Sequence, residues 1–89
     1  AQRQLDWIIG LNPFSSSTIV GVGYNQPLRM INCCEFSPPT PVLSGAVMNG
    51  LCGDKEDMPH LITYNNYSQS EYWMPAVAWT LWLMSEITK

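Results

Sequence analysis

The chain has 89 residues, a formal net charge of −3 and 46% hydrophobic residues, which is the size of at most one small domain. Charged residues make up 12% of it, about half of the usual share of roughly 25%. The four Lys and Arg residues are scattered, so they form no patch able to neutralise nucleic-acid phosphates. The composition therefore argues against nucleic-acid binding. So few charges also suggest a fragment or one part of an assembly.

The first nine residues, AQRQLDWII, are predicted to be the last turns of a helix. Leu5, Ile8 and Ile9 share one face of it at helical spacing. Gly10 is a natural helix stop, and Asn12-Pro13 prevents continuation. We therefore expect a helix that ends at Gly10.

Residues 10–70 are expected to form a long irregular loop, far beyond the usual length of a connection. Gly21-Val22-Gly23 is a weak nucleotide-binding signal, because position 26 is not glycine and no strand–helix frame surrounds it. These glycines are better explained by close packing or a turn. The high aromatic and proline content and the low charge favour an ordered, functional loop.

The middle of this loop contains several candidate ligands. Asp54, Glu56 and Asp57 cluster in a pattern that misses the spacing of a calcium-binding EF-hand, so we favour a solvated acidic turn over a metal site. His60 is the only histidine, and no nucleophile motif surrounds it. The chain has three cysteines, Cys33, Cys34 and Cys52. Either Cys33 or Cys34 forms a disulfide with Cys52, or all three are free thiols.

The segment 61–72, LITYNNYSQSEY, is rich in Tyr, Asn, Gln and Ser. Flat rings and amides suit the faces and hydroxyls of sugars. Asn and Ser equally favour ordinary turns. Composition alone leaves both interpretations open.

The last segment, Ser70 to Lys89, is predicted to be a helix that is apolar on every side from Met74 to Met84, with Thr80 as the exception. The run is too short to span a membrane, for which about 20 residues are needed, so we expect a helix packed on all faces inside protein. Pro75 fits the first turn, which places the start near Trp73 or Met74. The carboxylate of Glu71 then stands at the mouth of an apolar helix and is the best functional candidate.

Several of these segments together resemble the C-terminal part of family 9 glycoside hydrolases, which are endoglucanase-type cellulases. In that family a helix ending in W-x-x-G-x-N-P is followed by a serine, a glycine-rich turn and a proline, and a later Asn-Glu step precedes an apolar helix. The matching residues here are Trp7 to Phe14, Ser17, Gly21 to Pro27 and Ser70-Glu71.

The resemblance implies that the fold is all-α: the C-terminal portion of a six-hairpin α/α barrel, with two helices joined by a long irregular loop. Residues 1–89 would be a C-terminal fragment of the catalytic domain, and the remainder of that domain would be a partner. The resemblance also implies inverting hydrolysis of a β-linked glucan or related polysaccharide, with Glu71 as general acid and no cofactor. The aspartate that serves the family as base has no counterpart in this chain.

The residues expected to contact sugar are Arg29, Tyr64, Tyr67, Tyr72 and Trp73, whereas Trp79 and Trp82 are assigned to a core. The alternative for Arg29 is a salt bridge within the loop. The chain departs from the family pattern in lacking a histidine after Pro27 and in having Ser70 where the family has asparagine. A non-catalytic module from the same barrel, binding carbohydrate or protein, is therefore the alternative. The resemblance favours a secreted or periplasmic location, and we expect no membrane association.

Overall fold

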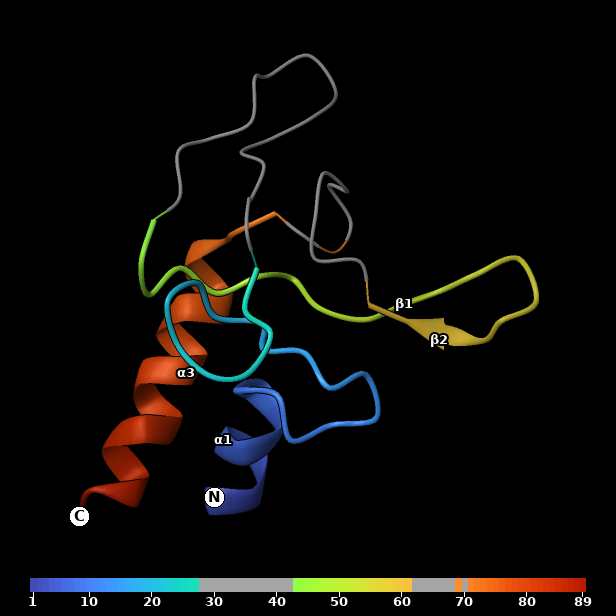
Figure 1. Cartoon of the computed structure of the whole chain (residues 1–89). Helices are drawn as coiled ribbons and strands as arrows, with labels where there is room; N and C mark the ends of the chain where they lie inside the picture. Colours follow the sequence, from blue (N-terminus) through green and yellow to red (C-terminus); the bar gives the residue numbers. More distant parts are fainter. Residues whose placement is uncertain (28–42, 62–68, 70) are drawn as a thin grey trace.

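The computed structural model of the chain describes residues 1–27, 43–61, 69 and 71–89. Helix α1 (Gln2–Ile8) is followed by strands β1 (Cys52–Gly53) and β2 (Pro59–His60) and by helix α3 (Met74–Ile87). Helices α1 and α3 lie side by side, and the β1–β2 hairpin projects away from them (Figure 1). Within the described ranges, no helix is both long and apolar enough to cross a bilayer.

The expected all-α fold is wrong. The described residues form two helices and a two-stranded antiparallel sheet, in which Cys52 pairs with His60 and Gly53 with Pro59, and they are not a portion of an α/α barrel. Strands of two residues are too short to produce the alternation of polar and apolar residues by which a strand is predicted. The turn between them is fixed instead by Asp54, whose Oδ1 accepts hydrogen bonds from the backbone N–H groups of Glu56 and Met58, both at 2.9 Å.

The end of α1 confirms the prediction for Gly10. The N–H of Gly10 donates to the carbonyl of Trp7 at 3.2 Å, and the N–H of Leu11 donates to that of Asp6 at 2.9 Å. This pair of bonds is a Schellman motif, which requires a left-handed residue that glycine adopts without steric cost. Gly10 has a φ of 116°.

Two polar side chains organise the turns after α1. The amide of Asn12 donates to the carbonyls of Trp7 and Ser16, both at 2.8 Å, and its oxygen accepts from the N–H groups of Phe14 and Ser16. Ser17 is fully buried, and its hydroxyl donates to the carbonyl of Val22 at 2.7 Å. The turns between Gly10 and Val22 are therefore stabilised by hydrogen bonds from these two side chains to nearby backbone groups.

Gly23 is needed for close packing, one of the two explanations predicted for the glycines at positions 21 and 23. The N–H of Tyr24 donates to the carbonyl of Ile9 at 2.9 Å, which draws Gly23 against the end of α1. A Cβ added at Gly23 would lie 2.2 Å from the carbonyl oxygen of Ile9, and its φ is 85°. Only glycine fits this approach.

The small core forms where residues 18–20 and 46–48 meet. The N–H of Val20 donates to Ala46 at 3.1 Å and that of Met48 to Thr18 at 3.0 Å, with an antiparallel bridge between Ile19 and Val47. The hydrophobic side chains buried in the described part of the chain are Ile19, Val20, Val47 and Met48.

Helix α3 begins at Met74, with Pro75 in its first turn, as predicted. Its inner face carries the buried Thr80, whose hydroxyl donates to the carbonyl of Ala76 at 2.8 Å. The expectation of a helix packed on all faces is wrong for the outer face. Trp79 and Trp82, which we expected in a core, are 65% and 58% exposed and stack on each other with ring centroids 5.2 Å apart. An apolar helix can be packed on all sides only where enough protein surrounds it.

Candidate functional site

Glu71 lies on the extended segment that leads into α3. Its carbonyl accepts a hydrogen bond from the N–H of Asn49 at 2.9 Å, and the next residue, Tyr72, forms an antiparallel bridge with Met48. The side chain of Glu71 is half-buried. The backbone of Glu71 and Tyr72 is thus paired with Asn49 and with the core residue Met48.

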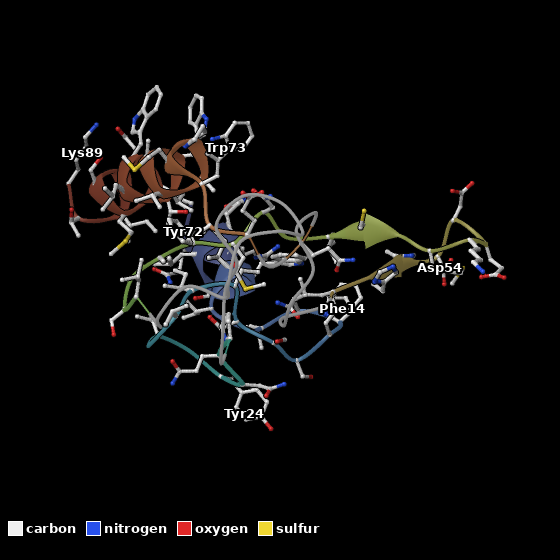
Figure 2. The ribbon with its side chains drawn as sticks, turned by 90° about the horizontal axis from the view of Figure 1, so that it is seen from above. Phe14, Tyr24, Asp54, Tyr72, Trp73 and Lys89 are labelled. Carbon is white, nitrogen blue, oxygen red and sulfur yellow. The ribbon has the colours of Figure 1, made fainter. Side chains whose placement is uncertain are left out.

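The two aromatic residues after Glu71 differ in their surroundings. Tyr72 is half-buried and packs against the core cluster of Val20 and Met48. Trp73 is the N-cap residue of α3 and is 63% exposed. Figure 2 shows Trp73 at the end of α3, and Tyr72 on the side of this helix that faces the rest of the molecule. Of these two predicted sugar contacts, Trp73 is therefore the one whose ring is open to a ligand, whereas Tyr72 contributes to the core.

The remaining predicted contacts, Arg29, Tyr64 and Tyr67, lie outside the described residues, as do Ser70, Cys33 and Cys34. Of the predicted site residues the structure describes Glu71, Tyr72 and Trp73, which are neighbours because they are consecutive in the chain. Cys52 is a half-buried free thiol.

The acidic cluster predicted as a turn does form one. Asp54, Glu56 and Asp57 are exposed at the tip of the β1–β2 hairpin, where the N–H of Asp54 donates to Met58 at 3.0 Å. Figure 2 shows Asp54 at the far end of the hairpin from Tyr72. No group of three potential metal ligands occurs among the residues that the structure describes. The carboxylate of Asp54 therefore stabilises the hairpin turn and lies apart from Glu71.

Sequence reasoning missed the contact between Gln69 and His60. The side chain of Gln69 is 1% exposed, and its Nε2 lies 3.1 Å from Nδ1 of His60 in β2. The carbonyl of Gln69 also accepts from the N–H of Gly50 at 3.1 Å. No pattern in the sequence announces this pair, because a glutamine in a polar stretch is usually exposed.

An apolar cavity of about 330 Å³ lies between α1, the core bridge and α3. Glu71 and Trp73 do not line it, so it is separate from the candidate site. Its lining residues are Leu5, Ile9, Ile19, Val22, Gly45, Val47, Val77, Thr80, Leu81 and Met84.

No protein-family model, curated protein or solved structure matches this chain. The resemblance to family 9 glycoside hydrolases therefore stays a hypothesis that depends on the motifs quoted above.

Proposed function

We propose that this chain supplies the general acid of a glycoside hydrolase that cleaves a β-linked glucan or a related polysaccharide with inversion. Glu71 donates a proton to the glycosidic oxygen of the leaving sugar. A second carboxylate, from outside these 89 residues, activates the attacking water on the opposite face of the sugar ring. The two carboxyl groups are then expected to lie roughly 6.5–9.5 Å apart.

The observation that carries the proposal is the local arrangement at Glu71. A general acid must be held in one place and must also be reachable by substrate. The backbone of Glu71 is held by the hydrogen bond from Asn49 and the bridge at Tyr72, while its side chain is half-buried rather than enclosed. The exposed ring of Trp73 lies two residues along and offers a flat apolar face of the kind that a sugar ring contacts.

The direct test is Glu71→Gln in the natural protein, assayed on soluble β-glucans. Glutamine keeps the size and polarity of the side chain but cannot donate the proton. We expect kcat to fall by about 10²–10⁴-fold, the usual contribution of a general acid. Unchanged turnover would rule out Glu71 as the acid.

Two controls separate a lost proton donor from a damaged site. Glu86→Gln makes the same chemical change on an exposed residue of α3 whose described partners are Lys89 and Trp82, so turnover should stay within about twofold. Aryl β-glycosides with a dinitrophenolate leaving group need no protonation, so Glu71→Gln should lower their hydrolysis by less than about tenfold. Equal losses on both substrate types would contradict the role of Glu71 as acid.

The exposed face of α3 favours a second candidate, a non-catalytic module that binds carbohydrate or another protein. Trp79 and Trp82 stack on each other and are both largely exposed, and Nε1 of Trp82 donates to Glu86 at 3.3 Å. In that case Trp79→Ala or Trp82→Ala would weaken binding to the ligand. Glu71→Gln would then leave binding unchanged, and the wild-type protein would release no reducing sugar from β-glucans.

A further inference from the structure

One buried side-chain contact joins the β1–β2 hairpin to the segment that carries Glu71. The amide of Gln69 is almost completely buried, and its Nε2 lies 3.1 Å from Nδ1 of His60. An NH₂ group can only donate, so Nδ1 of His60 is the acceptor and the ring carries its proton on Nε2. The contact thus requires the tautomer in which Nδ1 carries no proton.

The backbone carbonyls of Gln69 and Glu71 are hydrogen-bonded to residues 49 and 50, which lie between the core and β1. Residues 49 and 50 donate their N–H groups to the carbonyls of Glu71 and Gln69, at 2.9 Å and 3.1 Å. Tyr72 continues the pairing through its bridge to Met48. These bonds fix how far Gln69, Glu71 and Tyr72 lie from the core, and the contact with His60 fixes Gln69 against the hairpin.

We infer that His60 and Gln69 are positioning residues for the carboxyl group of Glu71. The inference rests on the proposed function. Glu71 lies only two residues from Gln69, so a rotation of the backbone at Gln69 moves the carboxyl group directly. A displacement of about 1 Å at a reacting group can cost on the order of 10²-fold in rate. His60 itself does not touch the substrate in this account.

A purely structural role would have different consequences. If His60 served only to hold the hairpin together, its loss would lower the melting temperature and leave the kcat of the remaining folded enzyme unchanged. A positioning role lowers kcat and leaves KM nearly unchanged, because the bond acts on the acid and not on the sugar. With a positioning role, kcat should also be restored by any substituted side chain that places a hydrogen-bond acceptor at the position of Nδ1.

The experiment compares three variants of the natural protein on soluble β-glucans. His60→Leu removes the acceptor, and we expect kcat to fall about tenfold to 10²-fold with KM within about twofold. His60→Asn retains an acceptor at about the place of Nδ1 and should keep kcat within about threefold of wild type. Asp54→Ala loosens the hairpin turn without touching Gln69 and should leave kcat within about twofold.

A spectroscopic measurement adds a direct check. Long-range ¹H–¹⁵N spectra of the wild-type protein should show a ring proton of His60 on Nε2 and none on Nδ1, and a proton on Nδ1 would overturn the inference. So would a wild-type kcat in His60→Leu, or a kcat in His60→Asn as low as in His60→Leu.

Glu71→Gln, assayed in the same series, tells the two hypotheses apart. If Glu71→Gln is inactive while His60→Leu is fully active, the proposed function stands and the positioning role falls. If Glu71→Gln is fully active, the proposed function falls. The positioning role then falls with it, because Glu71 would need no positioning for catalysis.

Discussion

Residues 9–27 and helix α3 border the same apolar cavity, yet they are stabilised in different ways. The first region has little regular structure but satisfies polar groups through hydrogen bonds within itself and to the end of α1, made by Asn12, by Ser17 and by the N–H groups of Ser17, Thr18 and Tyr24. Helix α3 satisfies its backbone by itself but leaves much of its apolar surface uncovered. Regular secondary structure and burial of apolar surface are therefore independent properties. The turn-rich residues 9–27 are anchored by side-chain and backbone hydrogen bonds, whereas large apolar side chains on the outer face of the regular helix α3 are exposed.

The largest effect is expected at Gly23. In Gly23→Ala the new Cβ would meet the carbonyl oxygen of Ile9 at 2.2 Å, so the turn or the end of α1 must move. We expect a loss of about 3 kcal/mol or more in the free energy of unfolding, measured by denaturant unfolding of the natural protein.

Gly45→Ala is the matched control, because Gly45 has the same φ of 85° but no atom within 4 Å of the added Cβ. It should cost only the left-handed strain, about 1–2 kcal/mol. Equal losses at both positions would show that the close approach at Gly23 contributes nothing.

A smaller loss is expected from Asn12→Ala. The amide of Asn12 makes four hydrogen bonds to backbone groups between residues 7 and 16, and alanine leaves those groups without this partner. We expect about 2–3 kcal/mol of destabilisation in the same unfolding experiment. Gln2→Ala, which removes one exposed bond to Asp6, should cost less than about 0.5 kcal/mol. Comparable effects of the two substitutions would contradict the central role of Asn12.

A further prediction concerns the exposed apolar surface of α3. The N-cap residue Trp73 is exposed, as are the large apolar side chains of Met74, Trp79, Leu81 and Trp82 on the helix. Large exposed apolar patches are rare on soluble monomers and mark interaction surfaces or a tendency to aggregate. We expect the 89-residue chain, expressed by itself, to bind the dye ANS strongly and to melt without a cooperative transition. The double variant Trp79→Gln and Trp82→Gln should reduce dye binding and aggregation severalfold. A cooperative calorimetric transition of the monomer would contradict this expectation.

The parts of the fold that the sequence predicted are those encoded by neighbouring residues. Gly10 and Asn12 end α1, and Pro75 begins α3, because each acts on backbone groups within a few positions of itself. The bridges of Ile19 with Val47 and of Met48 with Tyr72 depend on residues at least 24 positions apart, and no local pattern specifies them. The expected all-α fold was wrong for a different reason: strands β1 and β2 have two residues each, too few to show the alternation that predicts a strand.

In the candidate site, too, features encoded by neighbouring residues were predicted and contacts between distant segments were not. Glu71 was predicted because a carboxylate before an apolar helix is visible in the sequence. The burial of Gln69 beside His60 was not, since it arises only when the hairpin meets the segment before α3. The sequence likewise showed that α3 is apolar on all sides but could not show which side the described residues cover.

The smallest effect is expected at the tip of the hairpin. The Oδ1 atom of Asp54 accepts from the N–H groups of Glu56 and Met58, but the turn is exposed, so water can replace the carboxylate as acceptor. Asp54→Ala should therefore lower the free energy of unfolding by about 1 kcal/mol or less, and Asp54→Asn, which keeps an acceptor oxygen, by less still. Amide hydrogen exchange would report faster exchange at Met58 and unchanged exchange at Val20 and Met48. Faster exchange in the core as well would mean that the hairpin and the core unfold as one unit, which the short β1–β2 pairing does not lead us to expect.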